Sequence, residues 1–345
     1  MYMKAYFLAT ALCLLVGCHR TAAPDVSNIP VNLQMERFDR FLFTKMDTTD
    51  APRAYAQLQS SFPDFAPDFI TNILELPPPR TPFTDSVSVS TFAELKRFIR
   101  LTRPIYDSIA PHFNERASQD ALTQAFKYLK YYYPSYPVPR VVTYLGPFNA
   151  PGVALTNRAV AIGLQLYAGK DFSFYNNPQG LELYPQYISR RFEQPYIPVN
   201  VMTAVIQDLY PGQRTSGSLI SQMMEKGKQW YLLDKLLPGV PDSLKTGYTN
   251  RQLDWCADEE GLIWNFMVQS NDLYTTEPTF IQTYLGEAPA TPDMSPDAPG
   301  NIGQWVGWRI VQAYADKHPE ASPDAIMKTD GKKIFAESKY KPRFK

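Results

Sequence analysis

The sequence predicts an α+β fold that is predominantly helical, with a small β-sheet near residues 139–167. Two observations support this prediction. Apolar residues recur at helical spacing on both sides of that segment, whereas β-branched and aromatic residues, which are typical of strands, dominate inside it. The chain has 345 residues, of which 44% are hydrophobic and 14% aromatic, so it can bury a sizeable core.

The N-terminus has the layout of a bacterial lipoprotein signal. Lys4 precedes an apolar run at residues 5–16, which is shorter than the about 20 residues that a bilayer span needs and is typical of a signal peptide. The run ends in Leu-Val-Gly before Cys18, a tetrapeptide that resembles a lipobox. We therefore expect residues 1–17 to be removed and Cys18 to carry diacylglycerol and palmitate. The alternative is a short signal followed by an unmodified, buried cysteine.

After lipidation, residues 18–30 would form a tether and residues 31–345 a single domain. The chain has three cysteines. Cys13 lies in the removed segment and Cys18 carries the lipid, so Cys256 has no partner for a disulfide. No later apolar run reaches spanning length, which leaves the lipid as the expected membrane attachment. Lysine plus arginine equals aspartate plus glutamate at 34 each, and this balance argues against a nucleic-acid partner.

The N-terminal part predicts a strand that runs into a helix, followed by four helices. Pro77 ends the second of these four helices and Pro134 the last, because proline cannot continue a helix. The expected segments are residues 31–43, 54–61, 67–76, 91–109 and 120–133.

The central part predicts strands, and the remainder is again helical. A strand at residues 139–146 is followed by two more at 153–156 and 158–167, separated by Asn157, which resembles a hairpin or meander. Three later helices are expected at residues 184–192, 199–209 and 250–269. Another begins after a cap at Ser216 or Ser218, one begins near Asn301, and a short terminal helix begins at Ser322-Pro323, with proline at its first position.

The familiar catalytic motifs are absent from the sequence. His19, His112 and His318 lie far apart, so the paired histidines of a helical zinc platform cannot form. There is no CxxC pair, G-x-S-x-G elbow, phosphate-binding loop or G-x-G-x-x-G turn. We therefore expect no enzyme site of these classes, no metal and no cofactor. His112 is interpreted as a surface or structural residue and His318 as a helix cap.

Carboxylates are the remaining catalytic candidates. Asp258 precedes two glutamates and is interpreted as part of an acidic turn or solvated helix face, with a metal or acid–base role as the alternative. Glu225 lies on an apolar helix and is interpreted as a partly buried glutamate paired with Lys226 or Lys228, with a catalytic role as the alternative. Asp171 is interpreted as a turn residue, with a role as a ligand as the alternative.

Two tryptophans form a third class of candidate. Trp305 and Trp308, followed by Arg309, could display a stripe that binds sugar or peptide. An aromatic stripe at helical spacing is more often part of the core. Gly303 and Gly307 on the same helix predict the close approach of another helix.

Several segments together resemble the gliding-motility-associated lipoprotein family GldB of the Bacteroidetes. They are residues 32–39, 162–171, 223–234, 248–252, 255–256 and 300–311, in addition to the lipobox. The similarity covers nearly the whole mature chain. It implies an envelope lipoprotein linked to gliding motility and to the associated protein-secretion machinery. It implies no catalytic residues and no cofactor.

A second resemblance is to gluzincin-type metallopeptidases, which place a histidine pair on one helix and a third, glutamate ligand on a later helix. The helix predicted at residues 199–209 has no histidine. If the fold is a degenerate zincin-like one, Glu225 would be the leftover ligand, and it cannot hold zinc alone.

Three hypotheses follow. A non-catalytic scaffold or interaction lipoprotein predicts a filled vestigial pocket and an exposed apolar patch. A carboxylate-based hydrolase predicts that Glu225 and an aspartate such as Asp258 converge in an open cleft. A glycan- or peptide-binding lipoprotein predicts that Trp305 and Trp308 are exposed. We favour the scaffold because metal ligands and nucleophile motifs are missing, Cys256 stands alone and the chain has a lipid anchor. We expect the protein in the cell envelope and facing the periplasm, because the residues after Cys18 lack the acidic cluster of a surface-export signal. The choice of inner or outer membrane stays open.

Overall fold

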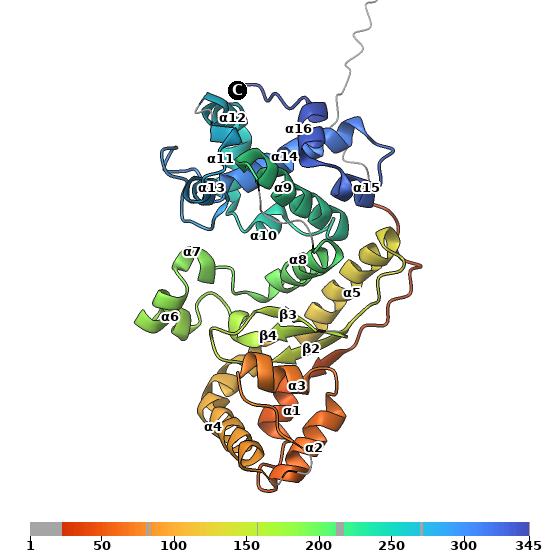
Figure 1. Ribbon diagram of the computed structural model, residues 1–345, viewed down its shortest axis with the longest axis vertical. Helices are drawn as coiled ribbons and strands as arrows, with labels where there is room; N and C mark the ends of the chain where they lie inside the picture. Colours follow the sequence, from red (N-terminus) through yellow and green to blue (C-terminus); the bar gives the residue numbers. More distant parts are fainter. Residues whose placement is uncertain are drawn as a thin grey trace, which may run out of the picture.

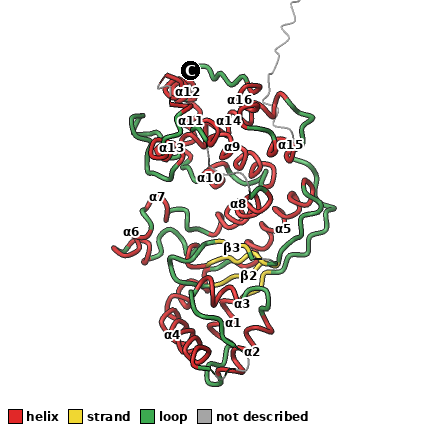
Figure 2. Tube along the Cα trace, in the orientation of Figure 1, coloured by secondary structure: helices red, strands yellow, loops and turns green. Residues whose placement is uncertain are grey.

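The computed structural model describes residues 23–80, 83, 85–156, 158–211, 217–269 and 272–344. The predicted signal segment, Cys18 and the first part of the tether lie outside the described residues, as do Asn157 and Ser216. Figures 1 and 2 show a mostly helical molecule with one small sheet. This confirms the predicted fold class.

The sheet has four strands in the order β1-β2-β4-β3. The strands are β1 (Met35–Arg37), β2 (Arg140–Tyr144), β3 (Val153–Leu155) and β4 (Ala159–Gly163). β3 and β4 are antiparallel, which confirms the hairpin. The meander alternative is wrong, because β2 pairs with β4 in parallel and β1 joins β2 in parallel from far away in the sequence.

Helices cover both faces of this sheet, so every residue of β4 is buried. On one side lie α1 (Phe38–Thr44), α2 (Ala51–Ser61), α3 (Ala66–Asp68), η1 (Phe69–Ile73) and α4 (Ser86–Ile109). On the other lie α5 (Glu115–Tyr132) and α8 (Ile197–Leu209). The helix expected at residues 67–76 is instead a short α-turn that continues as a π-turn.

Short elements connect β4 to α8. They are η3 (Leu164–Leu166), η4 (Ser173–Asn176), α6 (Pro178–Leu183), α7 (Gln186–Ser189) and η5 (Gln194–Tyr196). The helix predicted over residues 184–192 is therefore only the single turn of α7. Pro185 precedes this turn, and α7 ends at Arg190.

The C-terminal half, from α9 onward, consists of helices and loops without a strand among its described residues (Figure 1). It contains α9 (Leu219–Leu236), α10 (Asp242–Thr246), α11 (Asn250–Asp258), α12 (Glu260–Gln269), η6 (Asp272–Tyr274), α13 (Pro278–Leu285), α14 (Ile302–Lys317), α15 (Pro323–Lys328) and α16 (Gly331–Ser338). The single helix predicted over residues 250–269 breaks at Glu259. Ser322 caps α15 by accepting from the Ala325 N–H, as predicted.

Helices α9 and α14 are in backbone-to-backbone contact. A Cβ atom on Gly227 would lie 2.2 Å from the carbonyl carbon of Gly307, and one on Gly307 would lie 2.0 Å from the carbonyl oxygen of Met223. Only glycine permits this approach. The close helix packing predicted from Gly303 and Gly307 is confirmed.

One hydrophobic core extends through both halves, from Leu33 beside the sheet to Ile334 in α16. Among the described residues, no helix is both long and apolar enough to span a membrane.

Candidate functional site

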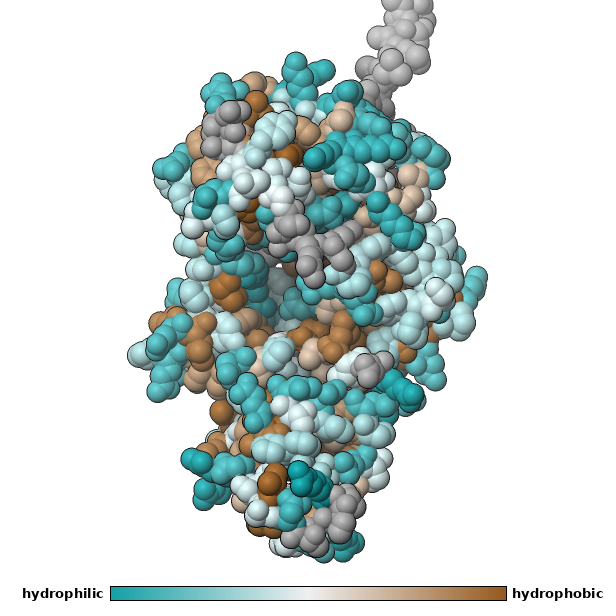
Figure 3. Space-filling model, in the orientation of Figure 1, coloured by the Kyte–Doolittle hydropathy of each residue, from teal (hydrophilic) through white to brown (hydrophobic). Residues whose placement is uncertain are grey.

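A cleft lies between the two halves of the molecule. It consists of two adjoining hollows of about 530 and 610 Å³. Figure 3 shows this face hollowed between the halves, with hydrophilic surface inside the hollow. The two hollows share lining residues, which makes them continuous: Arg191, Thr246, Gly247, Glu287 and Asn301.

Four chain segments meet at the smaller hollow: the end of α7, the turn between α10 and α11, residues 170–176, and the loop between α13 and α14. An ion pair joins the first to the last. Arg191 Nη1 and Nη2 lie 3.1 and 3.0 Å from the two carboxylate oxygens of Glu287. At the rim, Arg251 Nη2 lies 2.6 Å from Asp297 Oδ1. Both of these arginines are therefore neutralised.

Arg190 in the same hollow has only neutral partners. Its Nη2 donates to the carbonyl oxygen of Gly247 at 2.6 Å, and its Nε donates to that of Tyr187 at 3.3 Å. No carboxylate of the described residues forms an ion pair with it. Burial lowers the pKa of Arg190, because desolvation disfavours the charged form. The ordinary pKa of arginine is so high that the side chain stays charged at neutral pH.

Gly247 allows Arg191 to approach the α10–α11 turn. Its φ is +74°, in the left-handed region, and a Cβ atom there would lie 2.8 Å from Arg191 Nη1. Tyr248 supports the same turn, since its buried hydroxyl donates to the Gly300 carbonyl at 2.9 Å. Burial raises the pKa of Tyr248 well above its usual value, which keeps the phenol a neutral donor.

Asn301 lies at the junction of the two hollows and precedes α14. Its backbone is left-handed, with φ 50° and ψ 29°, and its side chain makes no capping hydrogen bond. The residue is 5% exposed. Its Oδ1 atom is buried and has no hydrogen-bond partner among the described residues. A buried polar atom left without a partner is costly.

The larger hollow combines polar walls with apolar contacts. Its amide and hydroxyl side chains come mainly from α8, α9, α13 and α14: Asn200, Thr203, Gln207, Gln222, Gln229, Gln282 and Gln304. Apolar side chains such as Val199, Ile206 and Leu233 lie among them. Such a surface can donate and accept hydrogen bonds while it excludes water.

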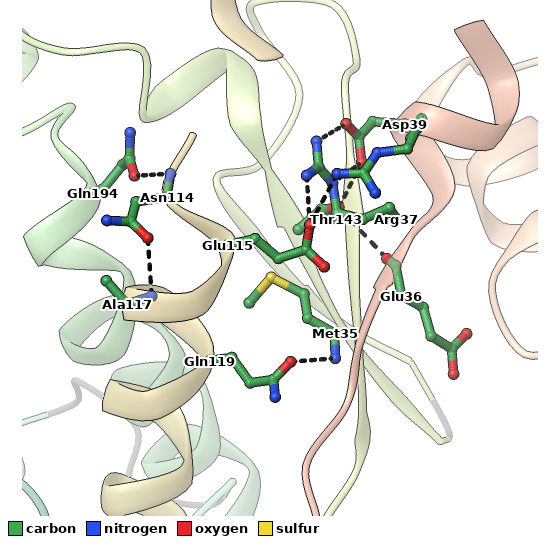
Figure 4. Close-up of polar contacts among 11 residues, drawn as sticks. Met35, Glu36, Arg37, Asp39, Asn114, Glu115, Ala117, Gln119, Thr143 and Gln194 are labelled. Carbon is green, nitrogen blue, oxygen red and sulfur yellow. Dashed lines mark hydrogen bonds and ion pairs between the residues drawn. The ribbon is translucent and has the colours of Figure 1, made fainter. Parts of the chain in front are cut away.

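A second polar cluster lies beside the sheet and is shown in Figure 4. Arg37 Nη2 lies 2.7 Å from Asp39 Oδ2, and Nη1 lies 2.9 Å from Glu115 Oε2. Thr143 donates to Asp39 Oδ1 at 2.6 Å. Asp39 is fully buried. Because each charge in this cluster has a partner, we interpret it as a structural tie between α1, α5 and β2.

The structure places the two carboxylate candidates outside the cleft. Glu225 Oε1 lies 2.7 Å from Lys228 Nζ, and Glu225 approaches Gly331 of α16. Lys228 also donates to the carbonyl of Thr329 at 2.9 Å. The predicted structural pairing of Glu225 is thus confirmed, with Lys228 as the partner. The interpretation of Glu225 as the leftover ligand of a degenerate zincin-like site stays a prediction.

Asp258 is exposed at the end of α11 and does not line either hollow of the cleft. This agrees with the interpretation as part of a solvated helix face. The described residues contain no group of histidine, cysteine, aspartate and glutamate side chains arranged to hold a metal ion.

Trp305 and Trp308 are 3% and 4% exposed. Their predicted core position is confirmed, and the alternative of an exposed binding stripe is wrong. Trp308 Nε1 donates to Asp234 Oδ2 at 2.8 Å, which fixes the indole ring inside the C-terminal half. His112 is exposed, and His318 stands at the end of α14, as predicted. The imidazole of His318 faces Glu320 and Glu337 rather than the last carbonyls.

The two most distinctive residues of the cleft, Arg190 and Asn301, were not candidates at the level of sequence. Asn301 stood only as a helix start. One further signal was available in the sequence. The segments 162–171, 223–234, 248–252 and 300–311 carry the resemblance to the family, and parts of each line the cleft. Their meeting point depends on the tertiary packing of both halves.

The protein therefore has an α+β fold with a polar cleft between its two halves. The family model described as gliding motility protein GldB matches residues 19–342. The chain therefore belongs to the GldB family, which confirms the resemblance noted in the sequence and associates the protein with gliding motility. No curated protein and no solved structure matches the chain.

Proposed function

We propose that the protein is a cell-envelope lipoprotein, anchored through Cys18 and facing the periplasm, that acts by binding other proteins of the gliding or secretion machinery rather than by catalysis. The observation that carries this proposal is the cleft, which is hollow rather than the filled pocket that we expected of a scaffold. Its walls provide amides, hydroxyls, apolar side chains and an unpaired arginine, a combination suited to holding a polypeptide. The two carboxylates considered as hydrolase candidates in the sequence, Glu225 and Asp258, do not line the cleft.

Membership of the GldB family supports the link to motility, and the lipobox before Cys18 supports the anchor. Two or more acyl chains hold a protein on a membrane stably. The tether would then leave the cleft free to meet partners at the membrane surface.

The test is site-specific photocrosslinking in a gliding bacterium that lacks its own copy of the gene. A photoreactive residue replaces Thr203, inside the cleft, or Arg116, whose side chain is 92% exposed on α5 as a matched position away from the cleft. We expect motility or secretion components to be crosslinked from position 203 and not from position 116. Equal crosslinking from both positions, or none, would contradict the proposal.

Catalysis is distinguished by Asp258→Asn and Glu225→Gln in the same strain. If the protein acts by binding, variants that still fold and still crosslink will still restore gliding. A folded variant that crosslinks normally but fails to restore gliding would favour the hydrolase. A Cys18→Ala variant should leave the membrane fraction and lose function.

A further inference from the structure

The smaller hollow of the cleft contains an arginine, Arg190, that forms no ion pair with any carboxylate of the described residues. Arg191 and Arg251 each have a carboxylate partner, whereas Arg190 is held by two backbone carbonyls. The other unpaired charges of this hollow, Lys170 and Asp171, are exposed neighbours at the rim. A half-buried guanidinium that still has free N–H groups is a fitting partner for a carboxylate.

The junction of the two hollows contains an acceptor without a donor. Asn301 is almost fully buried, its Oδ1 has no partner, and it lines both hollows. Rotation of the side-chain amide exchanges Oδ1 and Nδ2, so the residue can offer either atom to a ligand. Asn301 also stands at the N-terminus of the long helix α14, where the helix dipole favours negative charge.

A polypeptide C-terminus provides both missing groups at adjacent positions. Its carboxylate accepts from Arg190, and the N–H of its last peptide bond donates to Asn301 Oδ1 once rotation of the side-chain amide has brought this buried atom to the hollow. The preceding residues would then continue into the larger hollow, where amides such as Gln207 and Gln229 can pair with an extended backbone.

We propose that the cleft binds an extended polypeptide by its free C-terminal carboxylate, with Arg190 as the carboxylate-binding residue and Asn301 as the backbone acceptor. This inference rests on the proposed function and specifies the chemistry of the partner. A neutral sugar would leave Arg190 without an anion. Inorganic phosphate would leave the amides of the larger hollow unused.

The experiment measures fluorescence anisotropy with the full-length lipidated protein in detergent micelles. The probes are two pools of short fluorescent peptides with the same randomised sequences, one with a free C-terminal acid and one with a C-terminal amide. We expect the acid pool to bind roughly tenfold more tightly than the amide pool, as for the loss of one charged hydrogen bond. Equal binding of the two pools would overturn the proposal. Displacement of the acid pool by inorganic phosphate or a neutral disaccharide, at concentrations similar to that of the peptides, would also overturn it.

Variants at two residues, Arg190 and Asn301, locate the effect. Arg190→Gln should abolish the preference for the acid pool, while Arg190→Lys should keep part of it and Arg116→Gln, the matched remote control, should leave it unchanged. Asn301→Gly keeps the left-handed backbone accessible and should weaken binding of the acid pool roughly threefold, which tests the site even if Arg190→Gln is unstable.

Unchanged binding by a folded Arg190→Gln or Asn301→Gly variant would refute the assignment. If crosslinking from position 203 succeeds while the peptide preference fails, only this ligand chemistry is wrong; if the crosslinking fails, the proposed function fails.

Discussion

Replacement of Gly307 by alanine should destabilise the protein by forcing α9 and α14 apart. The added Cβ atom would lie 2.0 Å from the carbonyl oxygen of Met223 and 2.7 Å from its carbonyl carbon, whereas ordinary van der Waals contact begins near 3.4 Å. Both atoms belong to the backbone of α9, so no side-chain rotation relieves the clash. The helices would have to separate by about 1 Å, which forfeits a quarter to a half of the dispersion attraction across their interface.

The expected magnitude follows from two opposing effects. Overpacking of a core costs about 1–3 kcal/mol, and the backbone clash places Gly307 at the upper end of this range. Alanine returns about 1 kcal/mol through its higher helix propensity. The net loss is about 2 kcal/mol, or a melting temperature lower by about 4 °C for a chain of this size.

The assay is thermal unfolding followed by circular dichroism. Gly303→Ala should cost less than Gly307→Ala, because its nearest neighbour is the flexible end of Leu285, at 3.0 Å. Gly239→Ala is the matched control, since a Cβ atom there meets nothing within 4 Å, and it should melt within about 1 °C of the wild type. If Gly307→Ala also melts within that range, or no lower than Gly303→Ala, the close packing of α9 on α14 does not limit stability and the reasoning is refuted.

Three further predictions concern the core. Asp39→Asn should lower the free energy of unfolding in urea by about 3 kcal/mol, because it removes one partner of a buried ion pair with Arg37. The control Arg116→Ala breaks a 3.7 Å pair of exposed side chains and should lower it by less than about 1 kcal/mol. Equal losses for the two variants would argue against the structural role of the buried cluster. Burial raises the pKa of the Cys256 thiol, so Ellman's reagent should find no reactive thiol at pH 8 in the folded lipidated protein and one after denaturation; rapid reaction of the folded protein would contradict this. Burial also raises the pKa of Tyr133 from 10.0 to about 12. The neutral phenol is thus favoured in the folded state, and its contribution to stability is complete below pH 10 and is lost as the pH rises through about 12. Circular dichroism and absorbance at 295 nm should show alkaline unfolding in that window, with a higher midpoint for Tyr133→Phe, and an unchanged midpoint would exclude Tyr133 as a contributor.

Much of the local structure could be read from the sequence. The helical spacing of apolar residues over 91–109 and 120–133 predicted α4 and α5, with starts a few residues late because Asp85 and Asn114 cap them from outside the apolar pattern. The hairpin, the cap at Ser322 and the core position of Trp305 also followed from local patterns. These features depend on neighbouring residues, whose spacing the sequence displays directly.

Other features required the tertiary structure. The parallel pairing of β2 with β4 and the break at Glu259 depend on which faces are packed together, which local spacing does not specify. The same holds for the cleft. The sequence by itself determined the family, the long helices α4, α5, α8 and α14 and the close-packing glycines of α14. Only the packing of the two halves brought Arg190 from the end of α7 and Asn301 from the start of α14 to one cleft, because burial and missing partners arise only where distant segments meet.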